Sequence, residues 1–517
     1  MTNHFTSKAG GKAAGIASGA GMMLEGRGMA GAGTSAAYGA CAVSLQVLSR
    51  PLTLLTSKNM QRFLVALIVL DIPLQLDTHF GYRDDVAELG SIGGFGVSVT
   101  TVALVALYAA WIFEIVLVRR GSRPAFRLSF PLTTYVLVSV LSVLVASDRL
   151  LASFEVWILL QTLLLFVYFA SRVQSRGDVM FILRVLLIGL GVESAIILGL
   201  QAGLRFDVPG HPLKIEEFAV GAYSRIAGTL GSPNAAGGYI SLLLAPALSV
   251  IAAPVGRWDK RLAWLAFGLG LGALVCTFSR GAWTAFVLSL AVIGGAMWQR
   301  GRFPLKALIV LVVVILAVAF VFRSEIETRL LTDDGGAAIA RVYLMQVAVK
   351  IIRNHPVLGV GANNFPLVMT RYFGAGEWLY TVHNKYLLIC AEVGVGGLVA
   401  FVAFLISTIH RGWNVWKSND QLLSLLSLGM TAGIVGHTSH LFVDLFRGRP
   451  GVQLLWLMAS LIIAMSWMSV RGATVRRAKD QMPGPAMNPN RRQSPSHSVK
   501  IDPVQRIART SADNREW

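Results

Sequence analysis

The residues best suited to chemistry stand at the end of a long polar stretch, where a histidine precedes a hydrophobic run. His383 and Asn384 are followed, after nine residues, by Gly394 and then Gly397. An imidazole at this place can act as a general base near neutral pH, or donate a hydrogen bond to a phosphate when it is charged. A lone histidine at a helix start is more often a capping or interfacial residue, so its role stays open at this point.

Three arginines precede this histidine in segments that could bind phosphate oxygens through the planar guanidinium fork. Arg225 shares a short segment with Gly228, whose missing side chain lets backbone approach a ligand, and with Asn234, which suits a helix start. Arg280 lies in a short turn between two hydrophobic runs. Arg341 begins an amphipathic run that predicts a helix on the membrane surface. Each arginine could instead be solvated or snorkelling.

Composition places these residues in a membrane protein. Of 517 residues, 54% are hydrophobic and 14% are charged, whereas soluble domains carry roughly 25% charged residues. The net charge of +19 comes from basic residues in short loops and at the two ends, not from the clustered basic face that nucleic acid requires. Cys41, Cys276 and Cys390 show neither a disulfide framework nor metal-ligand spacing.

The hydrophobic runs are long enough to cross about 30 Å of hydrocarbon as helices. Because lipid offers no partner to an unsatisfied backbone group, such runs must be helical. We predict spans near residues 60–77, 92–118, 129–147, 151–170, 179–201, 235–254, 262–279, 281–298, 304–322, 385–409, 422–446 and 452–470. The expected fold class is therefore all-α, a polytopic membrane protein with about twelve transmembrane helices.

Basic residues alternate between loops and so predict the orientation. One set of loops contains Arg119, Arg120, Arg123, Arg127, Arg172, Arg176, Arg257, Lys260, Arg261, Arg300, Arg302, Lys306, Arg411 and Lys417. The loop at 78–91 instead carries Asp84, Asp85 and Glu88 with Arg83. The positive-inside rule then places both termini in the cytoplasm.

This topology divides the chain into three parts. Residues 1–58 form a flexible cytoplasmic arm, in which the weakly apolar run Ala30–Leu48 stays unassigned. Residues 59–470 form the membrane domain, with long extracytoplasmic loops at 202–234 and 323–384. Residues 471–517 are rich in Pro, Arg, Ser and Asn, which indicates a disordered basic tail, with its start near anionic lipid.

The sequence also limits the energy source of any reaction. No phosphate-binding loop of the form G-x-x-x-x-G-K-[ST] occurs on the predicted inner side. The long loops lie on the predicted outer side, where no nucleotide is available. We therefore expect an activated lipid carrier as the donor.

Taken together, the segments resemble the O-antigen ligase and polymerase family of bacterial membrane glycosyltransferases, the Wzy/WaaL-like family. The likeness covers residues 221–400. It consists of four segments in the family's order: Arg225 to Asn234, Ser279-Arg280-Gly281, Asn354-His355-Pro356 through Gly359 and Gly361, and His383-Asn384 followed by Gly394 and Gly397.

The resemblance implies transfer of a glycan from undecaprenyl diphosphate to an acceptor hydroxyl, without metal or cofactor, outside the cytoplasmic membrane of a bacterium. Carried over residue by residue, it makes His383 the catalytic histidine. It makes Arg225, with Arg280 or Arg341, the diphosphate ligands. Asn384, Gly228 and Asn234 are expected to support them, and Asp444 and Glu377 are weaker candidates for orienting groups. One direct displacement would invert the anomeric centre.

Three functions stay open on the sequence. A polymerase would join lipid-linked repeat units into a surface or exopolysaccharide, alongside export or chain-length-control proteins. A ligase would move a finished glycan onto lipid A core or a protein. A secondary transporter is disfavoured, because such carriers commonly show two equivalent halves and this chain shows no internal repeat. We favour the polymerase.

Overall fold

The protein is an all-helical bundle with two small hairpins. The structure, a computed structural model, describes residues 55–117, 126–204, 216–220, 223–301, 305–324, 326–327, 337–372 and 380–480. Most of the predicted arm, the run Ala30–Leu48 and residues beyond 480 lie outside this range.

A helix lies at the position of each predicted span. In order these are α2 (Lys58–Leu74), α4 (Val99–Leu117), α5 (Phe130–Ser142), α6 (Arg149–Arg172), α7 (Arg176–Gln201), α8 (Pro233–Ala252), α9 (Arg257–Cys276), α10 (Arg280–Gln299), α11 (Leu305–Val321), α15 (Lys385–Trp416), α16 (Gln421–His440) and α17 (Arg449–Asp480). α17 therefore continues ten residues past the predicted start of the tail.

Eight of the described helices are long and apolar enough to cross a membrane: α4, α6, α7, α8, α10, α15, α16 and α17. The other four differ for simple reasons. α2 and α11 have 17 residues each and α5 has 13, and charged residues fill the first turn of α9. The protein is thus a multi-pass membrane protein, and the number of twelve transmembrane helices stays a prediction.

The remaining elements lie in the connections. They are β1 (Asp77–Phe80), α3 (Asp84–Ala87), β2 (Phe95–Ser98), the 3-10 turn Val143–Val145, β3 (Glu216–Val220), β4 (Tyr223–Gly228), α13 (Ala337–Asn354), α14 (Phe365–Met369) and the 3-10 turn Thr370–Tyr372. β1 pairs with β2 and β3 pairs with β4, both antiparallel. The two predicted long loops therefore contain a hairpin and two helices.

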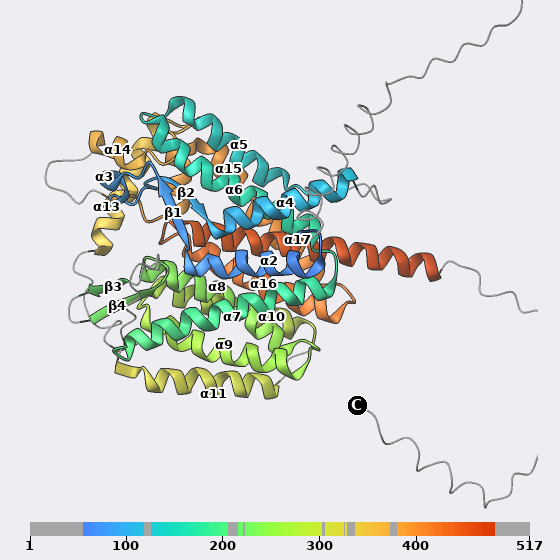
Figure 1. The fold of residues 1–517 in the computed structure, drawn as a ribbon. Helices are drawn as coiled ribbons and strands as arrows, with labels where there is room; N and C mark the ends of the chain where they lie inside the picture. The colour runs from blue at the N-terminus through green and yellow to red at the C-terminus, as the bar shows by residue number, and fades with distance from the viewer. Residues whose placement is uncertain are drawn as a thin grey trace, which may run out of the picture.

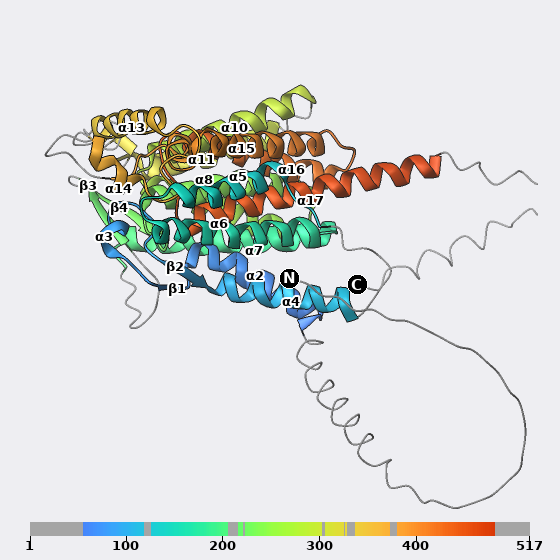
Figure 2. The ribbon, with the colours of Figure 1, turned by 90° about the horizontal axis from the view of Figure 1, so that it is seen from above.

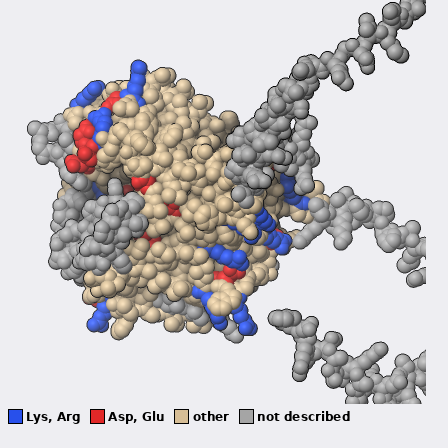
Figure 3. Space-filling model, viewed as in Figure 1, with Lys and Arg blue, Asp and Glu red and all other residues tan. Residues whose placement is uncertain are grey.

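All these connecting strands and helices gather at one end of the bundle, here called the loop end (Figures 1 and 2). α17 finishes at the opposite end, here called the tail end. On the face drawn in Figure 3, Lys and Arg lie mainly toward the two ends, and uncharged surface dominates between them. Such a band suits contact with lipid.

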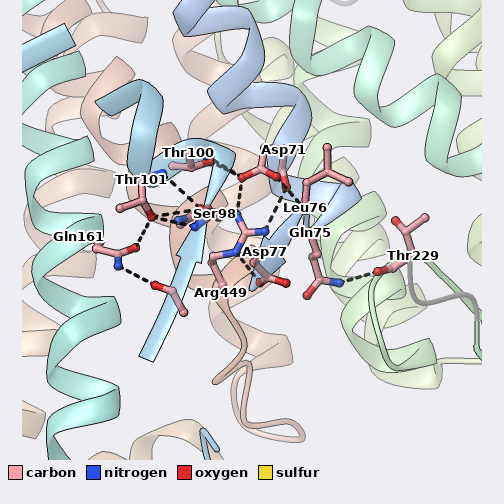
Figure 4. Close-up of polar contacts among 12 residues, drawn as sticks. Asp71, Gln75, Leu76, Asp77, Ser98, Thr100, Thr101, Gln161, Thr229 and Arg449 are labelled. Atoms are coloured by element: carbon pink, nitrogen blue, oxygen red, sulfur yellow. Dashed lines mark hydrogen bonds and ion pairs between the residues drawn. The ribbon is translucent and has the colours of Figure 1, made fainter. Parts of the chain in front are cut away.

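A buried ion pair joins three helices near the loop end (Figure 4). Asp71 on α2 accepts hydrogen bonds from Arg449 Nη1 at 2.8 Å, Thr100 N at 2.9 Å and Thr100 Oγ1 at 2.7 Å. Arg449, at the start of α17, also contacts Asp77 at 3.3 Å. A charge buried in an apolar bundle is tolerated when it is paired in this way.

The helix that follows His383, α15, is broken at Gly394, whose φ of 84° and ψ of 178° are not helical. The segment from Pro356 to Gly361 replaces the missing helix bonds. Val395 N donates to Pro356 O, Val360 N donates to Ala391 O, and Gly361 N donates to Glu392 O, each at 2.9 Å. Gly394, one of the two glycines noted in the sequence, therefore breaks the helix where this segment packs against α15.

We expect Gly394→Ala to destabilise the protein by about 2 kcal/mol or more, because a left-handed backbone disfavours a side chain. In addition, the new Cβ would lie 2.0 Å from the Val357 carbonyl oxygen. Thermal unfolding of the purified protein in detergent measures this loss.

Gly396→Ala is the matched control. A Cβ at Gly396 meets open space, and alanine favours a helix over glycine by about 1 kcal/mol, so this variant should unfold at or above the wild-type temperature. Equal unfolding temperatures for the two variants would contradict the proposed docking.

Candidate active site

Arg225 lies on β4, where the hairpin meets the bundle. Its Nε donates to the Thr277 carbonyl at 3.2 Å, and its Nη2 donates to Asn234 Oδ1 at 2.6 Å. Asn234 is in the first turn of α8, whose N-cap is Ser232. Two of the predicted site residues are thus in direct contact, and one face of the guanidinium is oriented by the turn before α10.

Gly228 supports this arrangement through the backbone. Its φ is +60°, and a Cβ there would lie 2.1 Å from Glu193 Oε1. The buried Glu193 carboxylate accepts hydrogen bonds from Thr229 N at 3.0 Å and Thr229 Oγ1 at 2.5 Å. Gln75, directly after α2, donates to the Thr229 carbonyl at 2.5 Å (Figure 4). The glycine leaves room for the carboxylate that holds the end of β4.

Arg280 is the first residue of α10, is exposed, and follows the N-cap Ser279. The next residue, Gly281, packs on α16: a Cβ at Gly281 would lie 2.7 Å from His440 Cδ2. Arg280 therefore starts its helix beside the C-terminal turn of α16.

His383 lies in the turn that opens α15. Its ring stacks on Tyr380, with 5.2 Å between centroids and 24° between planes. Asn384 is the N-cap of α15 and accepts a hydrogen bond from Leu387 N at 3.0 Å. Lys385 N donates to the carbonyls of Leu441 at 2.8 Å and Asp444 at 3.2 Å. Asn384 therefore caps the helix that follows His383.

Two charges act on the His383 imidazole. Burial lowers the pKa of His383 below its ordinary value of 6.5, the Asp444 carboxylate opposes this, and the Arg341 guanidinium lowers the pKa further. Arg341 is half-buried on α13 and is also close enough to interact electrostatically with His440. The net effect lowers the pKa of His383, which favours the neutral imidazole that a general base requires.

α13 is a helix, as its spacing predicts, but its apolar face is covered by protein. Leu344, Val347 and Ile351 pack in one core cluster with Leu388 of α15. This packing fixes Arg341 relative to the turn that carries His383.

The C-terminal turn of α16 lies between the two groups of predicted residues and contacts both. His440 packs against Gly281, next to Arg280, and Leu441 accepts the hydrogen bond of Lys385 N. This turn thus links the start of α10, which carries Arg280, to the turn that carries His383. Glu377 lies outside the described residues.

A buried ionic network beneath this turn was missed by the sequence reasoning. Arg447 pairs with Glu392 of α15 and lies 3.4 Å from Glu155 of α6; Lys385 lies 3.9 Å from Glu155. Glu392 Oε1 also accepts a hydrogen bond from Phe365 N at 3.0 Å. Charged residues within predicted membrane spans often indicate functional or structural sites. Glu155 and Glu392 lie in such spans, so their positions could have indicated this network.

The buried histidines His437 and His440 were also missed. They are 2% and 1% exposed, and both rings contact Phe446 with 4.7 Å between centroids. Their spacing of three residues places them on one face of the predicted helix. This spacing could have indicated that the two histidines lie close together.

Comparison with known protein families finds a match, and it covers much of the region described above. Residues 236–402 match a family model described as O-antigen ligase. The matched region runs from α8 into α15 and contains Arg280, Arg341 and His383, whereas Arg225 lies just before it. No curated protein matched the chain. That family implies a membrane glycosyltransferase-like enzyme, and residues 236–402 of this chain are similar to it, in agreement with the resemblance that the sequence motifs indicate.

Proposed function

We propose that the protein polymerises undecaprenyl-diphosphate-linked oligosaccharide repeat units into a surface or exopolysaccharide, at the outer face of a bacterial cytoplasmic membrane. The observation that carries the proposal is the gathering of His383, Arg341 and Asp444 at the loop end, on the other side of the α16 turn from Arg280. The turn before Arg280 contacts Arg225 through the Thr277 carbonyl. The proposed orientation puts the loop end outside and both termini inside.

In the proposed reaction, an acceptor hydroxyl attacks the anomeric carbon of the donor glycan. A new glycosidic C–O bond forms, and the bond from the anomeric carbon to the diphosphate oxygen breaks. The electron pair leaves with undecaprenyl diphosphate, and the hydroxyl proton passes to the His383 imidazole. Direct displacement inverts the anomeric centre. No metal is needed if arginines stabilise the leaving diphosphate.

Arg225 and Arg341 are the proposed diphosphate ligands. Arg225 is preoriented by Asn234 and the Thr277 carbonyl, and preorganised donors stabilise developing charge most effectively where water is excluded. Arg341 is favoured over Arg280 beside the reacting centre, because its charge acts on His383. Arg280 remains a candidate for the distal phosphate.

A ligase is the second candidate, favoured by the description of the family model as O-antigen ligase. The donor chemistry is the same and the acceptor differs. Purified protein incubated with lipid-diphosphate-linked oligosaccharide alone should yield a ladder of longer lipid-linked chains if it is a polymerase. Product that appears only after addition of lipid A core would establish the ligase instead, and unchanged donor under both conditions would exclude either function.

Replacing the proposed base should abolish transfer without loss of donor binding. We expect His383→Ala to reduce turnover by about 10²- to 10⁴-fold, the usual contribution of a general base, with donor affinity within a few-fold of wild type. Binding and turnover are measured on the same preparation. His410 is an exposed histidine on α15, and His410→Ala should leave both unchanged. Lost donor binding in His383→Ala would make the histidine a diphosphate ligand.

The pH dependence of transfer should respond oppositely to two charge removals. The neutral imidazole is the active form, so activity falls as pH drops through the pKa of His383. Arg341→Gln removes a charge that lowers this pKa, so the acid limb should move to higher pH; Asp444→Asn removes a charge that raises it, so the limb should move to lower pH. Profiles of turnover against pH check the signs, and shifts in the same direction would refute the assignment of His383 as base.

A further inference from the structure

Two neighbouring cavities open at the tail end, far from the candidate active site. The first, of about 590 Å³, lies between the α6–α7 turn, the α15–α16 turn and α17 near Arg471. The second, of about 360 Å³, lies between the start of α2, the end of α6 and the start of α7. Gln174 and Ser175 line both. They are called the basic cavities below.

Positive charge dominates their lining. Six basic side chains face the basic cavities, namely Arg176, Lys417, Arg471, Lys58, Arg62 and Arg172, against the two acidic side chains Asp420 and Asp178. Arg176 pairs with Asp420 at 2.5 Å and Arg172 with Glu114 at 2.8 Å. Among the described residues, no carboxylate pairs with the other four cations.

Two residues that line the basic cavities have buried polar atoms with no hydrogen-bond partner in the described part of the chain. Arg62 Nε has no hydrogen-bond partner, and neither has Ser418 Oγ. The Arg62 guanidinium lies over the Phe181 ring at 5.4 Å from its centroid, which fixes its position. An oxyanion in the second cavity would satisfy the Arg62 donor, and an oxyanion in the first cavity would satisfy the Ser418 hydroxyl.

The same cavities have an apolar side. Val65, Tyr168, Phe181 and Ile182 line the second cavity, and Leu423, Met468 and Val470 line the first. They belong to helices whose apolar stretches form the bundle, so the cavities lie where hydrocarbon would meet water. A free anion needs no apolar wall, whereas a lipid with an anionic headgroup does.

We propose that each basic cavity binds the phosphate headgroup of an anionic phospholipid, with Lys58 and Arg62 as the cationic ligands in the second cavity and Lys417 and Arg471 in the first. The lipid in the second cavity would contact the starts of α2 and α7, and the lipid in the first would contact the start of α16 and the part of α17 near Arg471. Binding of this kind is independent of the glycan donor, whose proposed site lies at the other end of the molecule.

Native mass spectrometry of the detergent-purified protein with phosphatidylglycerol tests the proposal. Wild type should bind phosphatidylglycerol well above phosphatidylcholine. The variants Lys58→Gln/Arg62→Gln and Lys417→Gln/Arg471→Gln should each lose affinity by roughly 25-fold, since each cation near a lipid surface contributes about fivefold. Arg257→Gln/Lys260→Gln removes two cations of the same end that do not line these cavities and should bind like wild type.

A charge-conserving variant separates binding from folding. Lys417→Arg/Arg471→Lys should retain phosphatidylglycerol. Equal binding by wild type and both glutamine variants would overturn the proposal, as would an equal loss in the control variant. Millimolar inorganic phosphate or glycerol phosphate that displaces the lipid from wild type would assign the site to a soluble phosphate instead.

Discussion

The structure of the loop end depends on an exchange of backbone hydrogen bonds at Gly394. In an unbroken helix the amide of Val395 would bond the carbonyl of Ala391. Here Val395 N turns to Pro356, and Ala391 O receives Val360 N in return. Within an apolar bundle an unmade bond is costly, so the break is tolerable only with the segment from Pro356 to Gly361 in place. The first turns of α15 and the polar connection before it are thus one unit.

Paired charges extend this unit to the rest of the bundle. Arg447 joins Glu392 on α15 to Glu155 on α6, and Arg449, two residues later, joins α17 to Asp71 on α2. Breaking such a buried pair by removing one partner typically costs about 3–5 kcal/mol. Arg447 lies in the short connection between α16 and α17, and Arg449 begins α17. This stretch therefore ties α15 to both α6 and α2.

Hydrophobic patterning predicted the helices well, because lipid leaves the backbone few alternatives. The family motifs also named residues that prove to be neighbours, such as Arg225 and Asn234. The sequence could not show which arginine acts on His383, since α13 is brought to α15 by packing of Leu344 and Val347 rather than by any local pattern. The sequence also could not predict the buried network of Glu155, Glu392 and Arg447, because the partners are distant in sequence. Only the position of charged residues in or beside apolar runs indicated them.

The break in α15 also gives a meaning to the nine residues between Asn384 and Gly394. As a helix these residues span about 13.5 Å. The Asn384 side chain caps one end, and the segment from Pro356 to Gly361 packs against the other. One inserted residue would turn one end against the other by about 100° and lengthen the helical segment by about 1.5 Å. The position of His383 relative to the docked segment would then change even with every side chain intact. The number of residues between Asn384 and Gly394 therefore sets the distance and rotation between the two ends of this helical segment. We expect similar chains to vary in residue type along the segment but to keep its length.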